Sequence, residues 1–140
     1  MLKLLLNVMI PLHVFLYRLT GGGIGGKIQT LPVLLLTTTG RTSGKPRTVP
    51  LAYLRDGPAY VIIASYAGLP QHPAWFLNLQ RHPEATIQVK RLQMKVKAET
   101  ANPEKKRELW ARLLEVAPGY ANYQTRTSRD IPIVLLHPVD

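Results

Sequence analysis

The sequence predicts an α+β domain that is mainly β: a small barrel of about six strands with helices around it. Six apolar runs rich in β-branched residues recur at short spacing between turn residues, which is typical of small barrels. The length of 140 residues is enough for one hydrophobic core and too short for two. We therefore expect a helix over residues 1–20 and a single barrel domain over residues 21–140.

The first 20 residues predict an amphipathic helix. They are mostly apolar, and Lys3, Asn7, Pro11 and Arg18 fall on one narrow stripe, with His13 off it. A membrane-spanning helix needs about 20 clean apolar residues, so these polar residues argue against a span. Two interpretations stay open: a helix packed on the domain, or a helix that lies on a membrane surface.

A glycine-rich run over residues 21–26 is expected to end this helix and to form a linker. It formally matches G-x-G-x-x-G, but it follows a helix and has no acidic residue at the required offset, which argues against a dinucleotide-binding turn. Two strands follow, over residues 31–39 and 48–55. The first is an apolar run that ends in three threonines, which predicts a buried strand.

Turn and capping signals divide the rest of the chain. Asp56-Gly57-Pro58 predicts a turn, His82-Pro83 ends a helix, and Asn102-Pro103 begins one. In order, the expected elements are a strand over residues 60–65, a loop over 66–73, a helix over 74–80, a hairpin of strands over 85–90 and 94–100, a helix over 103–116, a loop over 117–129 and a strand over 131–136.

Composition narrows the chemistry. There is no cysteine, which excludes disulfides, thiolate zinc sites and cysteine nucleophiles, and the four histidines lack metal-ligand spacing, so no metal site is expected. The formal net charge of +10 favours a polyanionic partner: nucleic acid, an acidic membrane surface, or a small ligand with phosphates and carboxylates. Aromatic residues make up 7% and do not interleave with the cations, so nucleic acid is not expected.

The strongest functional signal is the loop Gly40-Arg41-Thr42-Ser43-Gly44-Lys45-Pro46-Arg47, between the first two expected strands. Its glycines free backbone N–H groups, and each arginine can form paired hydrogen bonds with a phosphate or carboxylate. The spacing is one residue short of a P-loop, and a strand follows where a P-loop needs a helix. The loop therefore predicts an anion site, with a solvated hairpin turn as the alternative.

Three other segments are expected to converge with this loop on one ligand. Residues 65–68 end an apolar strand with a hydroxyl and a glycine, which permit the close approach of a planar ring. Residues 73–78 begin a helix whose free N–H groups suit an anion. Residues 118–123 add the phenols of Tyr120 and Tyr123.

Three motifs resemble those of the deazaflavin-dependent nitroreductase family. Residues 35–47, with the sequence LLTTTGRTSGKPR, resemble the opening motif of the family, and residues 72–79, followed by Pro83, resemble a later one. A looser match is Tyr120-x-x-Tyr123-Gln124, followed by residues 129–134. The resemblance runs in order from about residue 25 to residue 138.

This resemblance implies an FMN-binding-like split β-barrel that binds the reduced 8-hydroxy-5-deazaflavin coenzyme, F420. The coenzyme carries a phosphate and an oligoglutamate tail, which would account for the positive charge. By analogy, its phosphate end would be held by Arg41, Thr42, Ser43 and Arg47, with Lys45 nearby. The remaining coenzyme contacts would come from Thr48, Val49, Pro50, Leu51, Ala52, Ile63, Ala64, Ser65, Tyr66, Ala74, Trp75, Phe76, Leu77 and Asn78.

The resemblance also implies a reductase that transfers a hydride from the coenzyme to a quinone, a nitroaromatic or another conjugated acceptor. Tyr120 and Tyr123 would lie over the substrate, with Tyr120 as proton donor or substrate orienter and Ser65 as a second hydrogen-bond donor. The alternatives are an FMN-binding split-barrel reductase and a non-enzymatic protein that binds nucleic acid or a membrane surface. A cytoplasmic location is expected, peripheral at the inner face of the cell membrane if the first helix binds lipid.

Two positions depart from the family pattern. Tyr66 stands where relatives often carry lysine, and Val116-Ala117 lacks the aromatic residue that some relatives offer to bulky nitroimidazoles. These departures leave the range of acceptors open.

Overall fold

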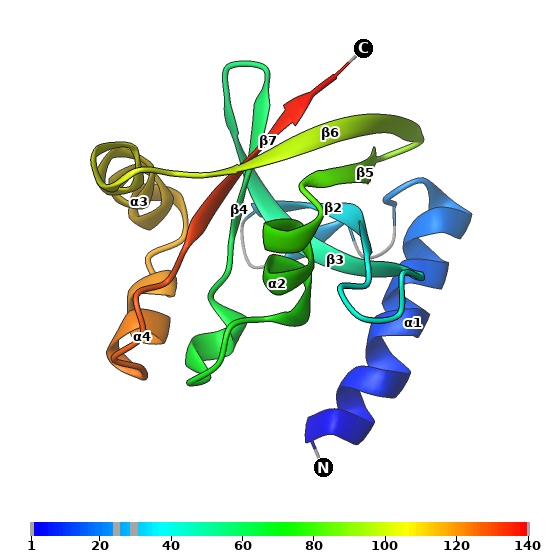
Figure 1. The fold of residues 1–140 in the computed structure, drawn as a ribbon, viewed down its shortest axis with the longest axis horizontal. Helices are drawn as coiled ribbons and strands as arrows, with labels where there is room; N and C mark the ends of the chain where they lie inside the picture. Colours follow the sequence, from blue (N-terminus) through cyan, green and yellow to red (C-terminus); the bar gives the residue numbers. More distant parts are fainter. Residues whose placement is uncertain (1, 24–25, 29–30, 140) are drawn as a thin grey trace.

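The computed structural model describes residues 2–23, 26–28 and 31–139, which form a closed antiparallel barrel flanked by helices (Figure 1). The elements in order are α1 (Leu2–Thr20), β1 (Lys27–Ile28), β2 (Leu31–Thr39), β3 (Pro46–Asp56), β4 (Ala59–Ile63), the 3-10 helix η1 (Tyr66–Gly68), α2 (Ala74–Arg81), β5 (Glu84–Val89), β6 (Leu92–Thr100), α3 (Pro103–Val116), α4 (Tyr120–Thr125) and β7 (Ile133–Pro138).

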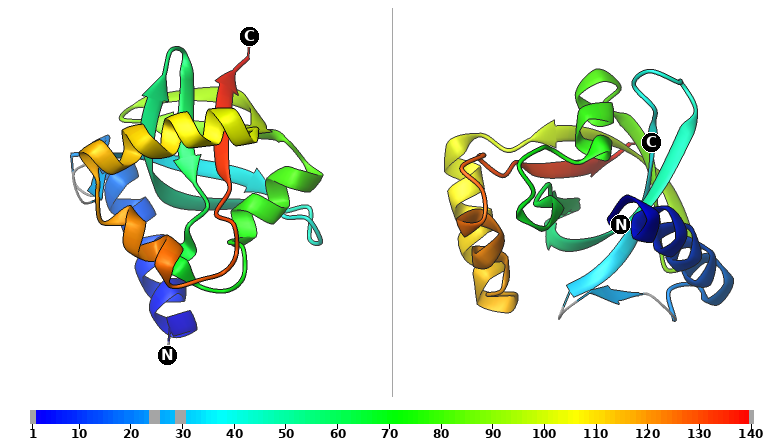
Figure 2. Two further views of the ribbon diagram at one scale, coloured as in Figure 1. Left: turned by 90° about the vertical axis from the view of Figure 1, so that its left-hand side faces the viewer. Right: turned by 90° about the horizontal axis from the view of Figure 1, so that it is seen from below.

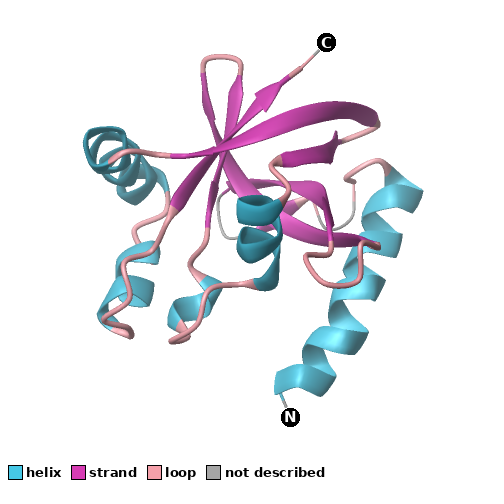
Figure 3. Cartoon of the chain, in the orientation of Figure 1, coloured by secondary structure: helices cyan, strands magenta, loops and turns pink. Residues whose placement is uncertain are grey.

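The six predicted strands form the barrel, in the order β2-β3-β4-β7-β6-β5, and β5 closes it by pairing with β2 (Figure 3). Leu36 lies opposite Ile87 and Thr37 opposite Thr86 at this closure. The short strand β1 adds to the edge of β2 and was not predicted, because its two residues carry no alternating pattern.

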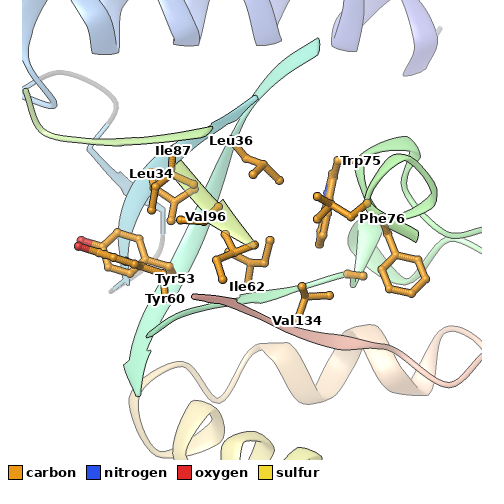
Figure 4. Packing of buried hydrophobic residues seen from close by; sticks show 13 residues of the cluster. Leu34, Leu36, Tyr53, Tyr60, Ile62, Trp75, Phe76, Ile87, Val96 and Val134 are labelled. Carbon is orange, nitrogen blue, oxygen red and sulfur yellow. The ribbon is translucent and has the colours of Figure 1, made fainter. Parts of the chain in front are cut away.

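The buried run of β2 serves two cores at once. Leu34 and Leu36 pack inside the barrel, whereas Val33 and Leu35 pack outside it against α1. Because successive side chains point to opposite faces of a strand and both faces are covered here, the run is apolar throughout. Figure 4 shows the barrel interior, with α2 closing one end of it through Trp75.

The helices α3 and α4 cover the outer face formed by β4 and β7 (Figure 2). Leu109 and Leu113 of α3 are fully buried there, together with Val61 and Ile133 from the strands. This packing brings α4 beside the end of β4, where the functional segments meet.

Two predicted loops contain helical turns. The loop over residues 117–129 includes α4, because Tyr120 packs into the core beneath α3, and the loop over residues 66–73 begins with η1. The loop between β2 and β3 is shorter than predicted, since Pro46 and Arg47 already pair with β2.

The helix α1 packs on the barrel, as one of the two interpretations predicted. The Tyr17 hydroxyl donates a hydrogen bond to the Val33 carbonyl at 2.9 Å and accepts one from the Lys90 N–H at 2.8 Å. The helix ends at Gly21 and Gly22, which have positive φ of 60° and 86°. The predicted linker continues through residues 24 and 25, which lie outside the described residues.

The outer face of α1 carries apolar side chains over the part whose side chains are described, residues 8–20. The large apolar side chains exposed there are Val8, Met9, Leu12, Phe15 and Leu19, each 53–65% exposed. None of the helices in the described part of the chain is long and apolar enough to cross a membrane.

Candidate active site

Two adjoining cavities bring the predicted segments together. The first, the cationic cavity, has a volume of about 540 Å³ and is lined by the β2–β3 loop, the start of β3 and α2. The second, the apolar cavity, has a volume of about 390 Å³ and lies between α1, β3, η1 and α4. Ile10, Val49, Ala74 and Trp75 line both cavities, which therefore form two ends of one groove of the size typical of small-molecule sites.

The loop at the cationic end is a tight turn that requires glycine. The Gly40 N–H donates to the Lys45 carbonyl at 2.8 Å, and the Gly44 N–H donates to the Gly40 carbonyl at 2.9 Å. A Cβ atom at Gly40 would lie 2.5 Å from the Ser43 Oγ, and Gly44 has a positive φ of 70°. The turn places Arg41 and Arg47 in the wall of the cavity.

Asn78 of α2 fixes this loop to the barrel. Its Oδ1 accepts hydrogen bonds from the Arg41 N–H at 3.1 Å and from the Arg41 Nη1 at 3.3 Å. Its Nδ2 donates to the Thr38 Oγ1 at 3.0 Å, and its side chain is only 3% exposed. The neutral amide of Asn78 thus orients Arg41 without neutralising its charge. The positive charge of Arg41 therefore remains available to bind an anion.

The apolar cavity carries no formal charge on the described residues that line it, apart from the ionisable phenols of its tyrosines. Tyr120 is 6% exposed, and its ring meets the Tyr123 ring edge to face at 5.3 Å. Burial, with a smaller contribution from Tyr123, raises the pKa of Tyr120 to about 12. The Tyr120 phenol is therefore neutral at physiological pH and available as a hydrogen-bond donor.

Most of the predicted site residues line one of these cavities. They are Arg41, Thr42, Ser43, Arg47, Thr48, Val49, Pro50, Leu51, Ala52, Ile63, Ser65, Tyr66, Ala74, Trp75, Asn78, Tyr120 and Tyr123.

Four predicted coenzyme contacts lie elsewhere in the structure. Phe76 and Ala64 are buried in the barrel core, and Leu77 packs against that core. Lys45 lies exposed on the loop, outside both cavity walls. The reason is local: Ala74, Trp75 and Asn78 lie on the face of α2 that lines the groove, whereas Phe76 and Leu77 lie toward the core.

Several lining residues were missed in the sequence. Ile10 and Pro11 of α1 line the cationic cavity, and Leu69 lines the apolar one. No local pattern marks them, because their place in the wall depends on how α1 and the β4–α2 segment pack on β3. Within the described residues, no group of three or more His, Asp or Glu side chains could hold a metal ion.

Comparisons with known proteins identify the family. The model of the F420H(2)-dependent quinone reductase family matches residues 9–138. An F420H(2)-dependent quinone reductase of Mycobacterium tuberculosis strain H37Rv is 42% identical over 134 residues, which are 91% of this chain and 89% of the relative.

Solved structures share the fold. A structure described as an F420-H2 dependent reductase (FDR-A) has a TM-score of 0.69 and 34% identity, covering 79% of this chain and all of the other. A structure described as a domain-swapped dimer has a TM-score of 0.71 and 32% identity, covering 90% of this chain and 96% of the other. The heme storage protein HutZ of Vibrio cholerae, at 14% identity, a TM-score of 0.61 and coverage of 94% and 91%, shares the fold alone.

The fold and the groove define a split-barrel, coenzyme-binding oxidoreductase. The chain belongs to the F420H(2)-dependent quinone reductase family. The predictions of a split barrel and of an F420-dependent reductase are confirmed, and the FMN alternative is not supported.

The residues of the groove fit F420. Its phosphate and carboxylates need cationic and hydroxyl donors, which Arg41, Arg47, Thr42 and Ser43 provide at one end. Its planar ring system needs an apolar wall, which begins at Trp75 and continues into the uncharged cavity.

Proposed function

We propose that this protein reduces a quinone with F420H2, holding the acidic end of the coenzyme in the cationic cavity and the acceptor in the apolar cavity. The observation that carries the proposal is the shared wall of the two cavities. Because Val49, Ala74 and Trp75 line both, a ligand bound at the cationic end extends directly into the apolar end. Nitroaromatic and other conjugated acceptors fit the same cavity, because its walls select for uncharged, planar molecules.

Arg41 and Arg47 bind the phosphate, with the hydroxyls of Thr42 and Ser43 as further donors. The positive end of the α2 helix dipole adds positive potential beside Ala74 and Trp75. The bound coenzyme supplies a hydride that adds to the acceptor. Val49 to Ala52 and Ile63 form an apolar wall around the space where the acceptor lies.

Tyr120 orients the acceptor as a hydrogen-bond donor. Burial raises the pKa of Tyr120 to about 12, so its phenol is protonated at physiological pH. Tyr120 therefore donates a hydrogen bond to the acceptor oxygen, with the Ser65 hydroxyl as a second donor and solvent as the proton source.

The coenzyme site is tested by titration with F420, using FMN and NADPH for comparison. Loss of one hydrogen bond to a charged group costs about 1.5–3 kcal/mol, so Arg41→Ala should weaken F420 binding roughly tenfold to a hundredfold. The Arg41 N–H still donates to Asn78 in this variant, so the loop should keep its fold. Lys45→Ala is the matched control: it removes the same charge from the same loop but lies outside the cavity wall. Equal losses in the two variants would show a general effect of charge and would remove the proposed site.

The acceptor site is tested with menadione. Tyr120→Phe should lower kcat/KM for menadione about tenfold, the value of one hydrogen bond of about 1.4 kcal/mol. The Kd for F420 should change much less, because the substitution leaves the groups that bind the acidic end of the coenzyme in place. A wild-type protein that binds F420H2 but does not oxidise it with menadione would contradict the quinone assignment.

We further propose that the protein works at the inner, cytoplasmic face of the cell membrane, with the outer face of α1 on the lipid. Leu12 and Phe15 are 53% and 60% exposed, and the cation Arg18 lies exposed on the same helix. Apolar area combined with positive charge favours an anionic lipid surface, where lipid-soluble quinones are found. On its inner face the same helix lines the groove through Ile10.

Deletion of α1 would damage the groove, so point variants are the appropriate test. Leu12→Ser with Phe15→Ser should abolish flotation with vesicles that contain anionic lipid and should leave turnover of water-soluble menadione unchanged. Unchanged flotation would contradict the membrane contact. A loss of dimers in the variant, without vesicle binding by the wild type, would instead assign this face to a second copy of the chain.

A further inference from the structure

Arg129, between α4 and β7, holds the segment that connects β4 to α2. Its Nη1 donates to the Ala64 carbonyl at 3.0 Å, its Nη2 to the Ser65 carbonyl at 2.9 Å, and its Nε and Nη2 to the Leu69 carbonyl at 3.3 and 3.2 Å. Its Nη1 also lies 2.9 Å from the His72 Nδ1. One half-buried guanidinium thus contacts three carbonyls and an imidazole of a single segment.

The backbone of this segment is unfavourable by itself. Tyr66, Ala67 and Gly68 have successive positive φ angles of 45°, 54° and 75°. Residues with a Cβ atom avoid this left-handed region, so the surroundings must stabilise it. Gly68 is packed tightly, because a Cβ atom there would lie 2.7 Å from the Tyr123 carbonyl oxygen. The guanidinium of Arg129 binds the carbonyls of Ser65 and Leu69, which flank this strained turn.

Arg129 is itself fixed by α4. The Gln124 Nε2 donates to the Arg129 carbonyl at 2.8 Å, and the Arg129 N–H donates to the Thr127 Oγ1 at 3.1 Å. Gln124 also accepts a hydrogen bond from the Ile131 N–H at 3.4 Å. The side chain of Arg129 therefore connects the helix that carries Tyr120 to the segment that carries Ser65.

These two elements form adjoining parts of the wall of the apolar cavity. Ser65, Tyr66 and Leu69 belong to the segment, and Tyr120 and Tyr123 belong to α4. Arg129 lines neither cavity, and the contacts of its side chain described above are with the segment between β4 and α2, not with the loop at the cationic end. Its influence is thus greatest at the acceptor end of the groove.

We propose that Arg129 is a positioning residue for the acceptor: it sets the distance between residues 65–69 and the tyrosines of α4, and so determines which acceptors fit. The inference rests on the proposed function for the meaning of that cavity. Burial, with a smaller contribution from Arg129, lowers the pKa of His72, in keeping with a neutral imidazole that accepts the hydrogen bond.

Arg129→Gln and Arg129→Lys test the inference, with Arg107→Gln on the exposed surface of α3 as the control. Lysine keeps the charge, but its single nitrogen cannot reach three carbonyls. Displacement of a substrate wall by about 1 Å can cost on the order of a hundredfold in rate. We expect kcat/KM for menadione to fall at least about tenfold in both variants, while the Kd for F420 changes by less than about twofold.

Hydrogen exchange of the whole protein supplies a readout that needs no coenzyme. The N–H groups of Gly68 and Leu69 donate to the Ser65 and Tyr66 carbonyls at 2.9 and 3.0 Å. Both amides should exchange faster in the Arg129 variants than in wild type or Arg107→Gln. Adding Ala67→Gly to Arg129→Gln should restore part of the menadione activity, because glycine adopts the left-handed conformation without steric cost.

Two results would overturn the inference: unchanged menadione kinetics together with unchanged exchange, or a loss of F420 affinity as large as the loss of kcat/KM. The second result would indicate a general role in folding. If Arg129→Gln does not fold, the same kinetics, F420 affinity and hydrogen exchange are measured in Arg129→Lys and in His72→Leu, a milder change that removes one contact. Failure of the wild type to use menadione would refute the proposed function, and the exchange experiment would still decide whether Arg129 holds the segment.

Discussion

Asn78→Ala should reduce the stability of the protein and its affinity for F420 together. The substitution removes three hydrogen bonds and leaves the Thr38 hydroxyl, on a residue that is 2% exposed, and the Arg41 N–H without their partner. The buried Thr38 hydroxyl left unpaired costs about 1–3 kcal/mol. The lost hydrogen bond of the exposed Arg41 adds about 0.5–1.5 kcal/mol, so the free energy of unfolding should fall by roughly 1.5–4.5 kcal/mol. For a domain of this size, Tm should fall by roughly 6–15 °C.

Asn78→Asp separates stability from binding. The carboxylate keeps an acceptor for both Arg41 donors, and the Thr38 hydroxyl can rotate to donate to its second oxygen. The fold should therefore lose less than about 1 kcal/mol. However, the added negative charge pairs with Arg41 and competes with the coenzyme phosphate, so the Kd for F420 should rise at least about tenfold.

The two variants are compared by urea unfolding, by thermal melts and by fluorescence titration with F420. The expected pattern is a destabilised, weakly binding alanine variant and a stable, weakly binding aspartate variant. An aspartate variant that binds F420 as tightly as wild type would refute the reasoning, because the phosphate could not then lie against Arg41. An alanine variant with an unchanged Tm would show that these hydrogen bonds do not support the fold.

Three further predictions concern stability. Tyr17→Phe removes the hydroxyl that donates to the Val33 carbonyl and should cost about 1–3 kcal/mol in urea unfolding, since it loosens α1; a loss below 0.5 kcal/mol, on the order of measurement error, would argue against this anchor. The hydrogen bond from Lys105 holds the pKa of Asp56 below its usual range. The stabilisation of the fold by ionised Asp56 is therefore present above the pKa of the unfolded chain and is lost as the pH falls through the lower pKa of the folded protein. In Asp56→Asn, the free energy of unfolding should depend less on pH in the acid range. The pKa of Tyr120 is raised to about 12, so its contribution to the free energy of unfolding is complete below about pH 10 and disappears as the pH rises toward 12. Between these pH values, the free energy of unfolding of Tyr120→Phe should fall less steeply with pH than that of wild type.

The parts of the site that lie close together in the sequence could be predicted from it. The residues from Gly40 to Arg47 are consecutive, and their glycines, hydroxyls and cations describe an anion-binding turn without any knowledge of the fold. The strands could be predicted equally well, because their apolar runs are bounded by strong turn signals. The helix α4 was missed, because residues 117–125 contain proline, glycine and asparagine, and the burial of Tyr120 outweighs their weak helix propensity.

Contacts between distant segments could not be predicted in the same way. Phe76 and Trp75 are neighbours with the same aromatic character, yet only Trp75 lines the groove, since the rotation of α2 on the barrel turns Phe76 into the core. Ile10 carries no sign of a role in the wall, because its position depends on the packing of Val14 and Tyr17 against β2.

The sequence alone determined the class of fold, the order of the six barrel strands along the chain and the cationic turn, because periodicity, turn chemistry and charge act over a few neighbouring residues. Only the tertiary structure decided which side chains meet. Asn78 reaches Arg41 across 37 positions, and Arg129 reaches Ser65 across 64. Such contacts are set by barrel closure and helix packing. Because these depend on the whole core, local sequence patterns do not predict which distant side chains meet.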